Sequence, residues 1–385
     1  MDRAQALIEQ GQVAAAIELL KRLAAQQPAN LDAWFALGRA HGMLHQDAEA
    51  EAAFRRAAQL RPDLRDAHLN VALSLVYQGK PRQAMPSMLE ARGLAREDRG
   101  VAETLLWVLL GVLQEESDAG PSVLPSLQPL QHDPLVSVVI PTRNRPALLR
   151  DALESVGRQR YDNWEAVVVN DGGQDVAQVL ASLPAAIGRR IRLLNLSSGR
   201  GAASARNRAI SEARGEVVAF LDDDDLYLPD HLSTLVAEMH ETRVPFAYTR
   251  SSAVEERIVG GGREEIRRGT QREYRVSHAM LQVRNLIPTA NWGVRRECLE
   301  LSGVFDDALP CAEDWDMLLR LSSRFALHMV PKVTTEIRVR PQEAEDSVTQ
   351  RVPLRPTCEL LYRRYPSGGH QLVELGREVY LECVT

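Results

Sequence analysis

FLDDDDLYLP, residues 220–229, places four consecutive carboxylates between an apolar run and a helix start. The run 216–221 is rich in β-branched and apolar residues, which predicts a buried strand, and Pro229 followed by Asp230 predicts a helix. The acidic turn is therefore expected at the carboxyl end of a central strand, the edge where open α/β sheets bind ligands. Mg²⁺ is usually held by one or two carboxylates together with substrate phosphates. Taken alone, the run is better explained as a solvated acidic turn, so the metal site depends on the other motifs.

The composition is that of a globular protein with more than one domain. Of 385 residues, 45% are hydrophobic and 25% charged, so two or three domains are expected. The net charge of −6 gives no electrostatic reason to expect nucleic acid as a partner. The cysteines form no C-x-x-C pair, which argues against a disulfide or zinc framework.

Nothing in the sequence suggests secretion or a membrane span. The N-terminus lacks a signal-peptide pattern, and the longest apolar run, 105–113, is shorter than the roughly 20 residues that cross a bilayer. We therefore expect a cytoplasmic protein without a transmembrane segment, or one that is peripheral at the inner face of the membrane.

Residues 1–116 carry a repeat with a period of 34 residues. The repeated columns contain small or apolar side chains, namely Ala16, Ala50 and Ala84, then Leu20, Phe54 and Met88, then Leu23, Ala57 and Ala91. Together with Trp34-x-x-Leu37-Gly38 and Pro62, this pattern resembles the tetratricopeptide repeat. Such helix pairs stack into a solenoid with a concave groove. The resemblance implies docking of an acceptor or partner protein, while self-association or a structural role fits equally well.

A proline-rich linker at 117–134 separates the repeats from an α/β domain. From residue 135 onward, strand-like and helix-like segments alternate, which predicts a mostly parallel sheet with helices on both faces. The predicted fold is thus α plus α/β, a helical solenoid followed by an α/β domain at 135–340. Residues 341–385 are predicted to form a C-terminal helical extension that packs back on a domain.

Four motifs follow the predicted strands and helices in a recognisable order. They are VVIPTRNR at 138–145, VVNDG at 168–172, ARN at 205–207 and LDDDD at 221–225. In order and spacing they resemble the family 2 glycosyltransferases, over residues 135–340. The resemblance implies an inverting enzyme with the A-type nucleotide-sugar fold. Such an enzyme uses Mn²⁺ or Mg²⁺ and moves a sugar from a nucleoside-diphosphate sugar to a hydroxyl of an acceptor glycan or protein.

The resemblance also implies a donor-nucleotide site at the carboxyl ends of the strands. Asp171 is expected to accept a hydrogen bond from the nucleotide base, and Arg206 to face the nucleotide or its diphosphate. Asp224 is the predicted metal ligand, although four identical neighbours leave the register open by one residue. The predicted donor-binding residues are Pro141, Thr142, Arg143, Asp171, Arg206, Asp222 and Asp223.

The reacting end of the domain contains a second acidic motif, Glu313-Asp314-Trp315. By resemblance it begins a helix beneath the acceptor, and Asp314 is the predicted general base that removes the acceptor proton. Glu313 and Trp292 are assigned to the acceptor or sugar, although an aromatic residue at 292 is also typical of a core. The polar, glycine-bearing segment 255–275 predicts a mobile loop over the site or an exposed insertion.

The end of the domain departs from the family pattern. Family members often carry a histidine that can join the metal site, but the matching stretch here is IRVR at 337–340 and ends in Arg340. A guanidinium cannot bind a cation, so the third metal ligand is left open. Either Arg340 contacts phosphate directly, or the metal is held less tightly.

Two alternative functions remain at this point. Sugar-phosphate nucleotidyltransferases share a related sheet, but they carry a glycine-rich phosphate loop after the first strand, which 141–144 lacks. The second alternative is a repeat-based scaffold whose glycosyltransferase domain is catalytically impaired. The missing histidine keeps this scaffold hypothesis open.

Overall fold

The computed structural model describes residues 1–116, 127–259, 262–270, 274–340 and 352–384. It divides into two compact units, one formed by 1–116 with 368–385 and the other by 117–367. Most of the predicted linker, 117–126, and the start of the predicted C-terminal extension, 341–351, lie outside the described residues.

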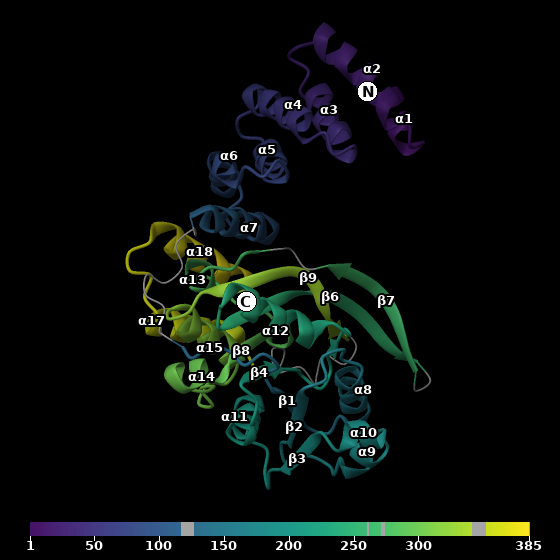
Figure 1. Cartoon of the computed structure of the whole chain (residues 1–385). Helices are drawn as coiled ribbons and strands as arrows, with labels where there is room; N and C mark the ends of the chain where they lie inside the picture. The colour runs from purple at the N-terminus through teal and green to yellow at the C-terminus, as the bar shows by residue number, and fades with distance from the viewer. Residues whose placement is uncertain (117–126, 260–261, 271–273, 341–351, 385) are drawn as a thin grey trace. The chain divides into compact units, whose positions relative to one another are not determined.

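The first unit is a stack of helices in which each helix packs on the next one in sequence (Figure 1). The C-terminal helix of the chain belongs to this unit and packs on the seventh helix. The helices are α1 (Asp2–Glu9), α2 (Val13–Gln26), α3 (Leu31–Met43), α4 (Asp47–Leu60), α5 (Arg65–Tyr77), α6 (Pro81–Leu94), α7 (Arg99–Glu116) and α18 (Gln371–Cys383).

The repeated positions form the core of this helical unit. Every described member of the first two columns is buried, namely Ala16, Ala50, Ala84, Leu20, Phe54 and Met88. Gly38 shows why small residues are needed where the helices pack. A Cβ atom at this position would lie 2.7 Å from the ring of Phe54. The aromatic ring of α4 therefore packs directly on the backbone of α3.

The second unit is built on a nine-stranded sheet with the order β3-β2-β1-β4-β8-β6-β9-β5, and β7 pairs with β6. The strands are β1 (Val136–Thr142), β2 (Trp164–Asn170), β3 (Ile191–Asn195), β4 (Val217–Phe220), β5 (Leu226–Tyr227), β6 (Phe246–Val259), β7 (Gly262–Thr270), β8 (Trp292–Arg295) and β9 (Leu327–Val339). The predicted parallel arrangement holds for β1 to β4. Beyond β4 the sheet is mixed, because β8 pairs antiparallel with both β4 and β6.

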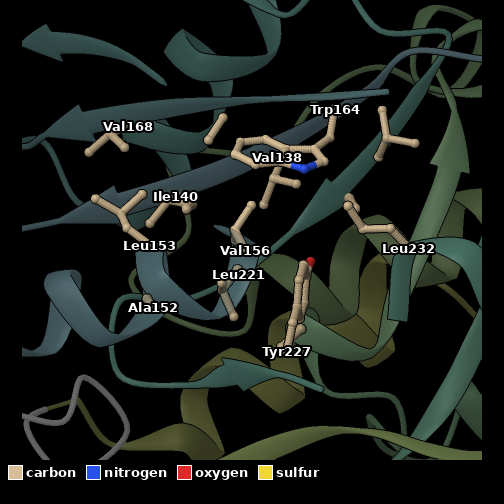
Figure 2. Close-up of a cluster of buried hydrophobic side chains, with 14 of the residues drawn as sticks. Val138, Ile140, Ala152, Leu153, Val156, Trp164, Val168, Leu221, Tyr227 and Leu232 are labelled. Atoms are coloured by element: carbon tan, nitrogen blue, oxygen red, sulfur yellow. The ribbon is translucent and has the colours of Figure 1, made fainter. Parts of the chain in front are cut away.

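Helices cover the sheet of the second unit and place its apolar residues in a continuous core. In Figure 2 the even-numbered side chains of β1 and β2 meet α8, for example Val138 and Val168 against Leu153. Leu221 and Tyr227, which flank the acidic turn, belong to the same cluster. The helical segments are α8 (Pro146–Gly157), α9 (Ala177–Ala181), α10 (Ala185–Gly188), α11 (Ala202–Glu212), α12 (His231–Thr242), α13 (His278–Leu281), the 3₁₀ helix at Thr289–Asn291, α14 (Arg296–Ser302), α15 (Glu313–Ser322) and α17 (Leu354–Arg364).

The polar segment after residue 255 is a β-ribbon, so the predicted loop is wrong for its described part. β6 continues to Val259, and β7 pairs with it in antiparallel register from 252 to 270 (Figure 1). Arg257 pairs with Glu264 across the ribbon, and Arg267 with Glu255. Opposite charges across the strands thus stabilise a segment that has no apolar face.

Two further features concern the cysteines and the hydrophobicity of the helices. All four cysteines are buried, and none forms a disulfide with another described residue. Among the described helices, none is both long enough and apolar enough to cross a membrane. The cytoplasmic location stays a prediction.

Candidate active site

The acidic turn follows β4 and is closed by a buried hydroxyl. Tyr227 donates from its hydroxyl to the carbonyl oxygen at the end of β4 at 2.5 Å, and the amide of Asp225 donates to the carbonyl of Asp222 at 3.1 Å. Burial alternates along the closed turn. The side chains of Asp222 and Asp224 are 31% and 27% exposed, whereas Asp223 and Asp225 are buried. Asp222 and Asp224 are therefore the two carboxylates within reach of a ligand.

The two buried carboxylates tie the turn to neighbouring strands. Asp223 accepts hydrogen bonds from the hydroxyl of Thr142 at 2.7 Å and from Nη1 of Arg145 at 3.2 Å. Asp225 accepts from the backbone amide of Arg338 at 3.0 Å, which fixes the end of β9. Their first role is thus to position the turn.

Burial and like charges raise the pKa values of this turn. The pKa of Asp223 rises to about 6, because burial disfavours the ionised carboxylate and Asp224 adds a like charge. The pKa values of Asp224 and Asp225 are raised for the same two reasons, with burial as the larger cause. Arg145 opposes this shift at both Asp223 and Asp224. The ionised form of the turn therefore depends on the neighbouring arginines.

Two arginines lie within ion-pair distance of the Asp224 carboxylate. Nη1 of Arg145 lies 3.1 Å from its Oδ2, and Nη1 of Arg340 lies 3.7 Å from the same oxygen. Nη2 of Arg340 also donates to the backbone carbonyl of Asp224 at 3.2 Å. The arginine at the position where the family often has histidine therefore contacts the predicted metal ligand.

These residues do not fit a preformed site for Mn²⁺ or Mg²⁺. Within the described chain, no group of three histidine, cysteine, aspartate or glutamate side chains is arranged to hold a metal ion. A cation on Oδ2 of Asp224 would also meet two guanidinium groups already paired with that oxygen. Repulsion between two unit charges 4 Å apart is about 4 kcal/mol at an effective dielectric constant of about 20. The ion at Asp224 stays a prediction, and no chemical step below is derived from it.

Asp171 follows β2 and fixes the loop that leads into α11. Its carboxylate oxygens accept hydrogen bonds from the amides of Arg200 at 2.7 Å and Gly201 at 2.9 Å. Gly172 has a φ of +65°, and a Cβ there would lie 2.4 Å from the amide nitrogen of Gly199. This close approach of two backbones requires glycine. The contact between Asp171 and a nucleotide base stays a prediction.

The residues predicted at the end of β1 differ in exposure. Pro141 and Thr142 are buried, and the hydroxyl of Thr142 is used by Asp223. Arg143 is exposed, and its guanidinium lies where a side chain at Gly199 would be. Arg143 is therefore the member of this group whose side chain is accessible to a ligand.

Arg206 joins the acidic turn to the start of α15. Its guanidinium is 5% exposed, donates to the carboxylate of Asp222, and donates to Oε1 of Glu313 at 2.6 Å. The centre of its guanidinium lies 5.5 Å from the ring centre of Phe305. Arg206 thus holds the two acidic motifs side by side, and its contact with a diphosphate stays a prediction.

Asp314, the predicted base, lies at the first turn of α15. Its Oδ2 accepts hydrogen bonds from Nδ2 of Asn285 at 2.8 Å and from the hydroxyl of Thr289 at 3.2 Å. Its Oδ1 accepts from the amide of Trp315 at 2.7 Å. The carboxylate is therefore held in one orientation by donors from two other segments.

The charge environment of Asp314 suits proton transfer near neutral pH. Burial and the negative charge of Glu313 raise the pKa of Asp314, Arg206 partly opposes them, and the resulting pKa is about 6. A general base is most effective when its pKa lies near the working pH. The geometry therefore gives a carboxylate that is mostly ionised at neutral pH and still basic enough to take a proton.

The third acid of α15 has a structural role. Asp316 is 1% exposed and accepts hydrogen bonds from Arg320 at 2.9 Å, Arg364 at 2.8 Å and the hydroxyl of Tyr365 at 2.7 Å. It anchors α15 to the end of α17.

The assignment of Trp292 to the sugar is wrong. Trp292 is fully buried, 4.4 Å from the ring centre of Phe220 and 5.2 Å from that of Phe246. No face of the indole is available for stacking on a ligand. Its position on β8, in the middle of the sheet, makes it a core residue.

Four residues of the site were given no role on sequence grounds. Arg145 lay inside a quoted motif, but nothing in the sequence showed that it would face Asp224. The other three depend on contacts between distant segments, which no local pattern shows. They are Asn285 and Thr289, which hold Asp314, and Glu256, which pairs with Arg340.

The second unit combines a mixed sheet with two acidic motifs that Arg206 joins, an arrangement that fits a glycosyltransferase domain. The model of the glycosyl transferase family 2 matches residues 137–300, and that of the tetratricopeptide repeat matches residues 7–70. The chain belongs to glycosyl transferase family 2 and carries tetratricopeptide-like repeats before its enzyme domain.

Individual relatives agree with this assignment. The Escherichia coli K12 protein named "Putative colanic acid biosynthesis glycosyl transferase WcaA" is 30% identical over 196 residues, which are 50% of this chain and 67% of that protein. The E. coli UDP-Glc:alpha-D-GlcNAc-diphosphoundecaprenol beta-1,3-glucosyltransferase WfgD is 35% identical over 118 residues, 30% of this chain and 45% of that protein. A crystal structure of S. aureus TarS 1-349 with UDP-GlcNAc aligns with a TM-score of 0.48 at 19% identity, covering 63% of this chain and 66% of that chain.

Proposed function

We propose that this glycosyltransferase transfers a sugar from a nucleoside-diphosphate sugar to an acceptor hydroxyl with inversion at the anomeric carbon. The observation that carries the proposal is the environment of Asp314. Its carboxylate has a pKa of about 6 and is held by Asn285 and Thr289. The adjacent residue, Glu313, is joined by Arg206 to Asp222 of the acidic turn. The name of the relative WfgD includes the donor UDP-Glc, which supports a nucleotide sugar as the substrate class.

In this mechanism the acceptor oxygen attacks C1 of the sugar while Asp314 takes the hydroxyl proton. The bond between the oxygen and C1 forms as the bond between C1 and the diphosphate oxygen breaks, and the nucleoside diphosphate leaves with the electron pair. Single displacement inverts C1, because the base and the leaving group lie on opposite faces of the sugar. Asn285 and Thr289 keep the lone pairs of Asp314 oriented during the transfer.

The donor side is assigned to the edge formed by β1, β2 and the acidic turn. Asp222 and Asp224 are the partly exposed carboxylates, and Arg143 is the exposed cation at the same edge. Thr142 and Asp223 are hydrogen-bonded to each other, so we assign them to positioning the site rather than to contact with the donor. The sequence predicted Mn²⁺ or Mg²⁺ on Asp224 at this donor site, and comparing turnover in EDTA with turnover in Mn²⁺ tests whether the site needs an ion.

The experiment is a donor panel with two enzymes. The wild-type full chain is incubated with UDP-, GDP- and dTDP-sugars, with EDTA or with Mn²⁺, and released nucleoside diphosphate is measured. We expect turnover of one donor by wild type and a large loss in Asp314→Asn. Equal behaviour of the two enzymes, or no turnover of any donor, would support the scaffold alternative.

We propose in addition that the repeats dock an acceptor or a partner protein. Met43 and Tyr77 lie one repeat period apart at the ends of α3 and α5, and they are 52% and 62% exposed. A double variant, Met43→Asp with Tyr77→Asp, is expected to lower transfer to the acceptor and leave donor hydrolysis unchanged. Leu94→Asp, an equally exposed position at the end of α6, is the matched control. Unchanged acceptor transfer in the double variant would contradict the docking role.

A further inference from the structure

The guanidinium of Arg340, a cation from the chain itself, lies against the acidic turn. Arg340 follows β9, and its side chain is 7% exposed. Its Nη1 lies 3.7 Å from Oδ2 of Asp224, and its Nη2 donates to the carbonyl oxygen of the same residue at 3.2 Å. The guanidinium therefore lies against the residue that was expected to hold a metal ion.

A second carboxylate fixes this guanidinium in place. Oε1 of Glu256 accepts a hydrogen bond from Nε of Arg340 at 2.8 Å, and the Glu256 side chain is 3% exposed. The register of β6 against β7 shifts between Glu255 and Glu256. The residue left without a partner at this shift is Ile266 of β7. A rotation of Arg340 away from Asp224 would leave Glu256 buried with one fewer cation, so the pairing is expected to persist when a ligand arrives.

The strand also provides an internal comparison. Arg338 pairs with the other oxygen of Glu256 at 3.1 Å and with Glu336 at 3.5 Å. Its side chain makes no contact with Asp224 among the described residues. Arg338 in β9 and Arg340 just after it thus share a carboxylate, and of their two side chains that of Arg340 contacts Asp224.

A departing diphosphate requires positive charge near its oxygens. Arginine provides this charge without a metal, since its planar group presents several N–H donors in the geometry of phosphate oxygens. Arg145, which contacts the same oxygen of Asp224 and is 27% exposed, adds a second cation at this site.

We infer that this donor site works without a divalent ion, and that Arg340, positioned by Glu256, supplies the positive charge for the diphosphate. The inference rests on the proposed transfer from a nucleoside-diphosphate sugar. It assigns to Arg340 a direct contact with the diphosphate and to Glu256 a positioning role.

The test is nucleotide binding to the full chain, measured by titration calorimetry with UDP, GDP and dTDP, in EDTA and in Mn²⁺. Wild type is expected to bind one nucleotide with dissociation constants that agree within about threefold between the two conditions. Arg340→His removes the fixed charge and supplies a neutral imidazole, the commonest metal ligand. This variant is expected to bind about 10- to 100-fold more weakly in EDTA and to recover in Mn²⁺, since a hydrogen bond to a charged group contributes on that scale.

Two further variants separate this role from a general loss of folding. Glu256→Gln keeps the side-chain shape but weakens the hold on Arg340, so binding in EDTA is expected to fall several-fold at unchanged far-UV circular dichroism. Arg338→His changes the other arginine that pairs with Glu256, and the Arg338 side chain does not contact Asp224. Nucleotide binding by this variant is expected to match wild type in both conditions. Binding by wild type only in Mn²⁺ would overturn this inference and leave the proposed function intact. Absence of binding in both conditions would overturn the proposed function and the inference with it.

Discussion

At the scale of single residues, Asp314 combines an oriented carboxylate with a raised pKa. Asp314→Asn keeps the size and the hydrogen bond from Asn285 but removes the base. We expect kcat to fall by about 10²- to 10⁴-fold, the range for loss of a general base. The measurement is release of nucleoside diphosphate in the presence of acceptor. Asp307→Asn, an exposed acid shortly before α15, is the control and should retain wild-type turnover.

The stability of Asp314→Asn provides a check that the variant is folded. A carboxylate whose folded pKa lies above its ordinary value stabilises the fold below that ordinary value, and this contribution is lost as pH rises through about 6. The variant is therefore expected to melt above wild type at pH 7.5. The advantage should disappear near pH 4. A lower melting temperature at pH 7.5 would contradict the raised pKa.

The pH profile of turnover tests the same carboxylate. Asp314 must be ionised to accept a proton, so turnover is expected to fall as pH falls through about 6. Asp223 has a pKa in the same range, so the profile alone does not identify the group. Asn285→Ala resolves this, because Asn285 donates to Asp314 and makes no contact with the acidic turn among the described residues. Loss of a donor to the ionised form raises its pKa, and the acid limb should move to higher pH. An unmoved limb would assign the profile to another group.

The sequence identified the carboxylates of the site but not the task of each one. Four identical aspartates give no local signal for burial. The two buried aspartates are held by partners from other segments, Asp223 by Thr142 and Asp225 by the amide of Arg338. The prediction that Trp292 contacts the sugar was wrong for a related reason. An aromatic residue in a strand gives the same sequence pattern whether it packs in the core or against a sugar. Arg206 was expected to face phosphate, and its two carboxylate partners come from segments distant in the chain.

At the scale of elements, α15 depends on one buried acid at its start. Asp316 holds Arg320 of its own helix and Arg364 at the end of α17. Asp316→Asn leaves two guanidinium groups without their buried carboxylate, and we expect a loss of about 3 kcal/mol or more in the unfolding free energy of the second unit. Urea unfolding followed by intrinsic fluorescence measures this, since Trp315 lies in the same helix.

The control for Asp316 is the other acid that pairs with Arg364. Asp306 contacts the same guanidinium at 2.7 Å, but its side chain is 27% exposed. Asp306→Asn is therefore expected to cost less than about 1 kcal/mol, as for exposed ion pairs. Equal losses in the two variants would show that burial of Asp316 is not the cause.

The ribbon of β6 and β7 shows what the sequence missed at this scale. Strands are recognised by alternation of apolar and polar residues, and a segment with charges on both faces has none. The ribbon is instead stabilised by pairs that only the register reveals, such as Arg257 with Glu264. The central strands were predictable for the opposite reason, because their burial on both faces requires continuous apolar runs such as 136–140.

At the scale of the whole chain, the two units differ in how far the sequence determines them. The repeats were predictable because each helix contacts its neighbours in sequence. The residues that pack together therefore recur with the period of 34 residues. The packing of α18 on α7 was not predictable from the sequence. Arg92 and Glu382 of this unit pair across nearly 300 positions, and no periodicity links them. Apolar residues at 373 and 375 indicated only that this helix packs on some surface.

The separation into units predicts that a packing defect in the repeats spares the enzyme domain. Gly38→Ala places a methyl group 2.7 Å from the ring of Phe54, inside the core of the helical unit. Such overpacking typically costs about 1–3 kcal/mol. Limited proteolysis of the full chain should then cut the repeats at a lower temperature than in wild type, while nucleotide binding by the second unit keeps its wild-type affinity.

Gly42→Ala is the matched control for this prediction. It lies on the same helix, α3, and a Cβ there meets no atom within 4 Å. Alanine in an open helical position is favoured over glycine by up to about 1 kcal/mol, so the repeats should resist proteolysis as well as or better than wild type. If both variants weaken the repeats alike, the helix itself rather than the ring of Phe54 excludes a side chain at position 38. If Gly38→Ala also weakens nucleotide binding, stability of the enzyme domain depends on the repeats, and the chain folds as one cooperative structure.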